Sequence, residues 1–232
     1  MVDSVKRLVC PGPGEVAWAE IDLADPKPGE VRVRNEYGAE KHGTMASFFK
    51  GVANERGRWD AEAGIHRPGE GVLWNYPIPL GNMNVGAAED GRRVAHWGPF
   101  QPFANVRETD LRELPEGVDW RDAMLLDPAE FALGALRDGG VRIGDRVAVF
   151  GLGAIGLVTT RLAKLAGASL VIGLDPSPER RAVSGADLAL DPSGDAGLAI
   201  REATGMLGAD VAIDFSGARP ALQAALRGVA YG

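Results

Sequence analysis

The sequence predicts a mixed α/β protein in which a β-rich first half precedes a doubly wound parallel sheet. Three observations lead to this prediction. Short segments that alternate polar and apolar residues recur up to residue 106, strand and helix patterns alternate after residue 144, and a glycine-rich turn at 151–156 joins a strand to a helix. Alternation with period two is typical of half-buried strands, whereas alternating strands and helices indicate a parallel sheet.

Composition narrows the classes of function. The 232 residues carry 25 Lys+Arg and 32 Asp+Glu, a net charge of −7, and 45% of them are hydrophobic. An acidic chain without clustered basic residues is not expected to bind nucleic acid, because phosphate backbones are held by Lys and Arg. No run of about 18 apolar residues predicts a membrane span. The single cysteine, Cys10, cannot form an internal disulfide, so a cytoplasmic location is expected.

Strand patterns dominate the first half. Five segments are predicted strands, in chain order 5–9, 15–21, 30–34, 92–97 and 103–106. Residues 30–34 alternate strictly between polar and apolar, whereas 5–9 are apolar only at their ends. Residues 50–75 mix charge, Gly and Trp and are predicted to be a long irregular loop. Residues 85–92 leave little room for a strand and a turn.

Helices and buried strands alternate in the second half. Residues 120–138 have apolar residues at helical spacing, and Pro128 predicts that this stretch is two helices. The strands and helices expected beyond it are strands at 146–150, 170–174, 186–190 and 211–215 and helices at 157–166, 196–206 and 220–227, with one shorter helix after residue 175. The boundary near 114–117 predicts two domains, 1–116 and 117–232.

The turn after the first parallel strand is the strongest motif. It reads Gly151-Leu152-Gly153-Ala154-Ile155-Gly156, follows the apolar run 147–150 and opens a helix. Gly151 permits the tight turn, Gly153 lets a pyrophosphate approach the backbone, and Gly156 lets the helix pack closely on the sheet. The free N–H groups of a helix N-terminus favour phosphate there. All six residues are therefore predicted to bind a dinucleotide.

A carboxylate follows the next strand. Asp175 lies 24 residues after Gly151, where an acidic side chain accepts hydrogen bonds from the adenosine ribose hydroxyls. It would repel a 2′-phosphate, so NAD is expected rather than NADP. Arg180 and Arg181 argue the other way, because they could pair with that phosphate, and Arg180 is counted among the cofactor-binding residues. A similar turn that binds no dinucleotide, or that serves a methyltransferase, stays open.

The order of these parts resembles the medium-chain dehydrogenase/reductase family. The matching stretches are residues 27–34, 141–147 and 208–217, and the resemblance extends over nearly the whole chain. It implies a GroES-like β-rich catalytic domain over 1–116, a Rossmann domain over 117–232 that lacks its last strands, and an active site in the cleft between them. It also implies a homodimer or homotetramer. The chain looks shorter than an intact member of the family, so the resemblance implies a fragment, a truncated product or a joined set of ordered segments.

The positions that hold catalytic zinc in this family differ here. Zinc-dependent members usually carry a Cys before a Gly-Thr/Ser-Asp motif, whereas Glu40-Lys41-His42 precedes Gly43-Thr44-Met45 in this chain. Asn82 and Met83 stand where the family has a ligating His and Glu, and Asp127 takes a third acidic position. The resemblance therefore implies the zinc-free branch, with no metal ligands. A zinc site assembled from Glu40, His42 and Asp127 remains the alternative.

Without zinc, a side chain must handle the proton of the substrate hydroxyl. His42 is the first candidate because imidazole titrates near neutral pH. Lys41 could stabilise an alkoxide, Thr44 could relay a proton, and the substrate is expected near Thr44 and Asp127. The plain alternative is that residues 40–42 form a solvated turn. His66 and His96 are expected to be structural. Four aromatic residues could line a substrate pocket, namely Trp59, Trp74, Trp97 and Tyr76.

These observations predict an NAD-dependent oxidoreductase. It would transfer a hydride between nicotinamide and a small-molecule substrate that is an alcohol, polyol or ketone, without catalytic zinc. The alternatives are a quinone or enoyl reductase of the same family and a non-catalytic nucleotide-binding protein.

Overall fold

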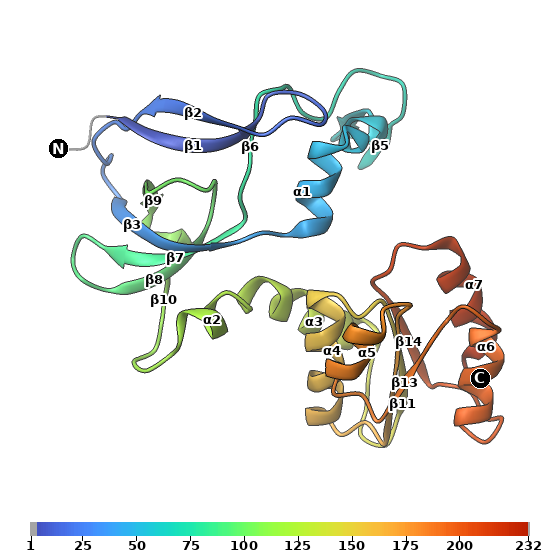
Figure 1. Ribbon diagram of the computed structural model, residues 1–232. Helices are drawn as coiled ribbons and strands as arrows, with labels where there is room; N and C mark the ends of the chain where they lie inside the picture. Colours follow the sequence, from blue (N-terminus) through green and yellow to red (C-terminus); the bar gives the residue numbers. More distant parts are fainter. Residues whose placement is uncertain (1–3, 232) are drawn as a thin grey trace. The chain divides into compact units, whose positions relative to one another are not determined.

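The computed structural model describes residues 4–231 and divides the chain into two compact units, Met1–Met124 and Leu125–Gly232 (Figure 1). The elements of the first unit are β1 (Ser4–Cys10), β2 (Ala17–Asp22), β3 (Glu30–Ala39), α1 (His42–Phe49), η1 (Val52–Arg56), β4 (Arg58–Asp60), β5 (Ile65–Arg67), β6 (Ile78–Pro79), β7 (Met83–Ala88), β8 (Arg93–Trp97), β9 (Phe103–Arg107), η2 (Glu108–Asp110), β10 (Arg112–Glu113) and α2 (Trp120–Ala123).

Antiparallel sheets form this first unit. Its described strands make a five-stranded sheet of order β10-β8-β7-β3-β9, a three-stranded sheet of order β2-β1-β6 and the hairpin β4-β5. Val33, Val94 and Val106 fill the core of the larger sheet. The alternation at 30–34 predicted β3 as a half-buried strand, because apolar residues that alternate with charged ones reach one face of a sheet.

Two expectations for the first unit were wrong. Residues 85–92 hold both a strand and a turn, since β7 is the middle strand of the larger sheet and a turn joins it to β8. Nearly every residue of β7 is buried, so this strand lacks the polar alternation that marks a half-buried one. Residues 50–75 are also more regular than expected, because η1 and the β4-β5 hairpin lie there.

The second unit is a parallel sheet with helices on both faces. Its elements are α3 (Leu126–Asp138), β11 (Arg146–Phe150), α4 (Ala154–Leu165), β12 (Leu170–Leu174), α5 (Pro178–Val183), β13 (Leu188–Leu190), α6 (Ala196–Ala203), β14 (Val211–Asp214) and α7 (Arg219–Gly228). The described strands follow the order β13-β12-β11-β14, and all pairs are parallel. The predicted doubly wound sheet is confirmed.

Two cores cover the two faces of this sheet. Val147 and Val149 of β11 pack with Leu136 of α3 on one face. The alternate residues Ala148 and Phe150 pack with Ile200 of α6 on the other. Burial on both faces explains why β11 is a continuous apolar run, which is the pattern that predicted its bounds.

The predicted break near Pro128 is confirmed. Helix α2 ends at Ala123, α3 begins at Leu126, and Pro128 lies in the first turn of α3. A proline is tolerated there because the N–H groups of a first turn have no partner within the helix. Helix α6 ends at Ala203, earlier than expected, because Gly205 and Met206 both have positive φ.

Candidate functional site

Backbone contacts build the turn between β11 and α4. Gly151 has φ +84°, and a Cβ there would lie 2.7 Å from the backbone nitrogen of Ser216. A Cβ on Gly156 would collide with the carbonyl oxygen of Gly151. Both positions therefore require glycine, for the two reasons that the motif predicted.

The start of α4 leaves main-chain donors for a ligand. Gly153 is the N-cap of α4 and provides no side-chain cap, so Ala154, Ile155 and Gly156 open the helix without one. Their N–H groups precede the first intrahelical bonds, as in every helix, and the helix dipole favours an anion at this end. Leu152 differs from the other five residues, because its side chain is fully buried in the core.

Asp175 follows β12 and accepts a hydrogen bond from the turn. Its Oδ2 accepts a hydrogen bond from the N–H of Leu152 at 2.8 Å, and its Oδ1 accepts one from the N–H of Ser177 at 2.8 Å. The residue is only 2% exposed. A carboxylate has about four acceptor sites, so it retains capacity for ribose hydroxyls. The structure thus brings Asp175 to the glycine turn, as the spacing suggested.

The two arginines after Asp175 are placed differently. Arg180 Nη1 lies 3.6 Å from Asp175 Oδ2, and the Arg180 side chain stays 53% exposed. Arg181 donates to the carbonyl oxygen of Asp175 at 2.6 Å and pairs with Asp191 at 3.4 Å. The guanidinium of Arg181 is therefore occupied by contacts within the protein. Arg180 lies beside the carboxylate of Asp175, and about half of its side chain is accessible to a ligand.

Ser216 is a site neighbour that the sequence analysis did not single out. It follows β14, and Asp214 Oδ1 accepts hydrogen bonds from both its N–H (2.7 Å) and its hydroxyl (2.6 Å). β14 pairs in parallel with β11, so the carboxyl ends of both strands meet at one edge, where open α/β sheets bind ligands. Only the strand order places Ser216 at the site, and the strand order cannot be seen in the sequence.

The candidate catalytic turn lies in the first unit, where β3 leads into α1. Lys41 is the N-cap of α1, and its carbonyl accepts the hydrogen bond from the N–H of Met45 at 2.9 Å. His42 and Thr44 are exposed in the first turn. One helical turn therefore brings three of the predicted catalytic residues together. Asp127, 5% exposed, lies in the first turn of α3 in the second unit.

The positions corresponding to the family's zinc ligands do not fit zinc. Met83 is fully buried at the start of β7, and the carbonyl of Asn82 accepts a hydrogen bond from the N–H of Gly98 at 2.8 Å. Zinc sites use thiolate, imidazole and carboxylate, so a thioether and an amide are the wrong donors. Among residues 4–231, no three His, Cys, Asp or Glu side chains form a group suited to a metal ion.

His96 is held inside the larger sheet of the first unit. It is 1% exposed, and its Nε2 lies 2.8 Å from Asn35 Oδ1. Burial lowers the pKa of His96, which favours the neutral ring. His66 instead packs edge-on against Trp59, with ring centroids 4.9 Å apart. Both environments are consistent with structural roles.

Comparison with known proteins places these features in a family. A family model described as "Zinc-binding dehydrogenase" matches residues 154–232. D-guloside 3-dehydrogenase of Escherichia coli K12 is 38% identical over 253 residues, which cover 98% of this chain and 71% of the relative. The chain belongs to the medium-chain dehydrogenase/reductase family. Its membership makes it an alcohol dehydrogenase-like oxidoreductase that uses a nicotinamide cofactor.

Other known proteins are similar to this chain in sequence or in fold. Human sorbitol dehydrogenase is 27% identical over 251 residues, covering 94% of this chain and 70% of the relative. A solved structure described as a short chain alcohol dehydrogenase from Escherichia coli CFT073, complexed with cofactor NADH, has a TM-score of 0.78 at 20% identity, covering 98% of this chain and 74% of that one, which shows a likeness of fold. Among residues 4–231 of this family member, no helix is long and apolar enough to span a bilayer.

Proposed function

We propose that this dehydrogenase oxidises a secondary hydroxyl of a polyol or glycoside with NAD, and does so without catalytic zinc. The observation that supports the proposal is the hydrogen bond from the N–H of Leu152 to Asp175, which joins the carboxylate that we propose binds the ribose to the turn that we propose binds the phosphates. A buried carboxylate at this position favours free ribose hydroxyls over a 2′-phosphate. The exposed Arg180 beside it is the feature that would favour NADP.

Relatives support the substrate class. D-guloside 3-dehydrogenase and sorbitol dehydrogenase, by their names, oxidise a sugar derivative and a polyol. A secondary hydroxyl on a carbohydrate is therefore the reacting group that we propose.

The proposed chemistry separates hydride from proton. The turn at residues 151–156 and Asp175 would hold the dinucleotide, whose nicotinamide would supply the acceptor for the hydride of the carbinol carbon. His42 takes the hydroxyl proton as general base, and its exposure in the first turn of α1 leaves its ring open to substrate. Lys41 stabilises the developing alkoxide by its positive charge, and Thr44 offers a hydroxyl relay in the same turn. Asp127 is proposed to bind a substrate hydroxyl.

We propose a mechanism without zinc because of the donor atoms at the positions that correspond to the family's zinc ligands. An amide at Asn82 and a buried thioether at Met83 replace the family's ligand pair, so we route no step through a metal. Elemental analysis of the protein, prepared in metal-free buffer, should find less than one zinc per chain. One tightly held zinc per chain would contradict this part of the proposal.

Two measurements test the function. NADH fluorescence should rise and shift on titration with the protein, with tighter binding than NADPH. The protein should then reduce NAD in the presence of polyols or glycosides. Turnover with quinones or enoyl substrates alone would favour the reductase alternative, and binding without any turnover would favour a non-catalytic nucleotide-binding protein.

Two further expectations are part of the proposal. Light scattering should find a homodimer or homotetramer, and fractionation of cells should find the protein in the cytoplasm.

A further inference from the structure

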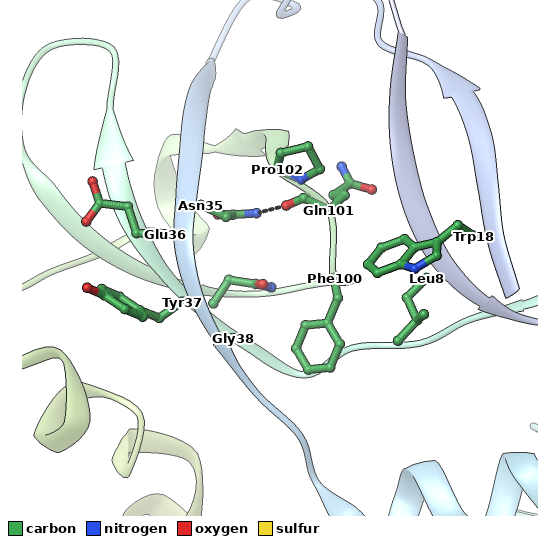
Figure 2. A pocket seen from close by; sticks show the side chains of 10 residues that line it. Leu8, Trp18, Asn35, Glu36, Tyr37, Gly38, Phe100, Gln101 and Pro102 are labelled. Carbon is green, nitrogen blue, oxygen red and sulfur yellow. Dashed lines mark hydrogen bonds between the residues drawn. The ribbon is translucent and has the colours of Figure 1, made fainter. Parts of the chain in front are cut away.

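A pocket of about 350 Å³ lies in the first unit, between β1, β2 and β3 (Figure 2). Its volume falls at the lower end of the range for small-molecule sites, about 300–1,000 Å³. Figure 2 shows Leu8, Trp18 and Phe100 together on one side of it and Glu36 and Tyr37 on the other. One wall is therefore apolar and aromatic, and the opposite wall carries polar groups.

A glycine shapes the aromatic wall. A Cβ on Gly38 would lie 2.7 Å from two atoms of the Phe100 ring, so any larger residue displaces this ring. The buried amide of Asn84 holds the segment before Phe100, because its Nδ2 donates to the carbonyl of Gly98 at 3.0 Å. Asn84 Oδ1 lies 3.4 Å from the same Cβ position, so it faces the side of Gly38.

Some polar neighbours of the pocket are fully engaged, and others are not. Asn35 donates to the carbonyl of Gln101 at 2.8 Å and its Oδ1 lies 2.8 Å from His96 Nε2, so it belongs to the framework. Glu36 pairs with Arg34 through one oxygen at 2.7 Å. Its carboxylate therefore retains acceptor sites for a ligand, as does Asn84 Oδ1.

Trp18 completes the pocket from an edge strand. Strand β2 is paired only with β1 among the described strands, and the indole of Trp18 is 61% exposed. A large ring at the mouth of a pocket offers a flat apolar face, and a sugar ring presents a C–H face of matching size with hydroxyls at its edge. The acceptors on the other wall suit those hydroxyls.

We propose that this pocket binds a pyranose ring, and is thus a saccharide site separate from the residues assigned to hydride and proton transfer. Gly38 precedes His42 by four residues, a span of at most about 14 Å. The ring could be the non-reacting part of a glycoside substrate or a free sugar that acts as an effector. The recognition chemistry is the same for both.

Calorimetric titration with a methyl pyranoside, without NAD, tests the proposal directly. Wild-type protein should bind, and Trp18→Ala and Gly38→Ala should each weaken binding about tenfold, since an aromatic contact and its placement are lost. Trp59→Ala is the matched control, because this 48% exposed tryptophan does not line the pocket. NADH affinity and thermal unfolding of each variant show that it is folded.

No binding of any methyl pyranoside by wild type, or equal binding by all variants, would overturn the proposal. Kinetics then separate the two sources. For a substrate ring, Trp18→Ala raises KM for glycosides but not for open-chain polyols. For an effector, an unreactive methyl pyranoside changes the rate of the wild type but not of Trp18→Ala. Failure of all turnover would refute the proposed function and leave the calorimetric result standing.

Discussion

The turn from β11 into α4 and the turn from β3 into α1 both start a helix shortly after a strand, and neither helix has a side-chain cap. They differ in what holds them. Main-chain contacts at Gly151 and Gly156 fix the first turn, and the side chain of Leu152 is buried beneath it. The second turn displays His42 and Thr44 to solvent.

We expect the two turns to differ in how well they tolerate substitution. A turn made from backbone serves one ligand, because any side chain added at Gly151 or Gly156 disturbs its shape. A turn that carries exposed side chains can exchange them without disturbing the core. The contrast is compatible with a chain that has the G-x-G-x-x-G motif but no Cys before Gly43-Thr44.

The largest expected effect comes from adding one methyl group to the backbone-built turn. Gly156→Ala places a Cβ against the carbonyl of Gly151, so we expect NADH binding to weaken at least about 100-fold. Gly134→Ala is the matched control, because a Cβ there meets nothing within 4 Å in α3, and helix propensity should stabilise it. Fluorescence titration measures both. Unchanged NADH affinity in Gly156→Ala would break the contrast.

The next effect concerns the side-chain turn. His42→Ala should lower kcat about 100-fold, since general-base catalysis contributes about 10²–10⁴. NADH affinity should stay unchanged, because the glycine turn is intact. Steady-state kinetics and titration on the same preparation separate the two quantities. Full turnover by His42→Ala would remove the imidazole from the proposed mechanism.

Asp175 tests whether a side chain also belongs to the backbone-built turn. Asp175→Ala leaves the buried N–H of Leu152 without its acceptor, at a cost of about 1–3 kcal/mol. NADH binding should weaken about tenfold or more. The ratio of NADH to NADPH affinity should fall, because Asp175 no longer repels a 2′-phosphate and Arg180 loses its neighbouring carboxylate. If the affinity ratio of NADH to NADPH does not change, Asp175 does not select the cofactor.

The smallest expected effect concerns an ion pair between the start of β11 and the residue before β14. The guanidinium of Arg146 donates two hydrogen bonds of 2.6 and 2.8 Å to the carboxylate of Asp210, and its backbone N–H donates a third at 2.8 Å. The pairing with the Arg146 side chain is the main cause that lowers the pKa of Asp210 to about 2. Because the folded-state pKa lies below the unfolded one, the stabilisation is present above pH 4 and is lost as pH falls towards 2.

Asp210→Asn should therefore reduce the free energy of unfolding by about 1 kcal/mol at pH 7, a value discounted for partial exposure. The difference from wild type should shrink between pH 4 and 2, and NADH affinity should not change. Chemical denaturation at a series of pH values measures it. A difference that persists at pH 2 would show that the carboxylate charge is not responsible.

Sequence patterns predicted the second unit better than the first, for a physical reason. Strands β11 and β12 are buried on both faces, so their apolar runs and the glycine turn between them mark their bounds. Strand β7 is just as buried but lies among glycine and alanine, which carry weak strand signals. Helix α1 was missed because residues 40–42 look like a polar turn.

The cofactor half of the site was also easier to predict than the rest. Gly151, Gly156 and Asp175 lie together through geometry that the spacing of the motif encodes. Ser216 lies beside the turn only because β14 is the parallel neighbour of β11, and strand order depends on contacts far apart in sequence. The pocket near Trp18 depends in the same way on three strands meeting.

The alternation of β11 has a consequence for how this protein can change. Odd-numbered residues of the strand fill one core and even-numbered residues fill the other. A slip of a single residue would exchange the two sets and spoil both cores at once. Both cores thereby hold the strand that leads into the glycine turn in one register, whereas the loops that follow the strands lie outside these two residue sets.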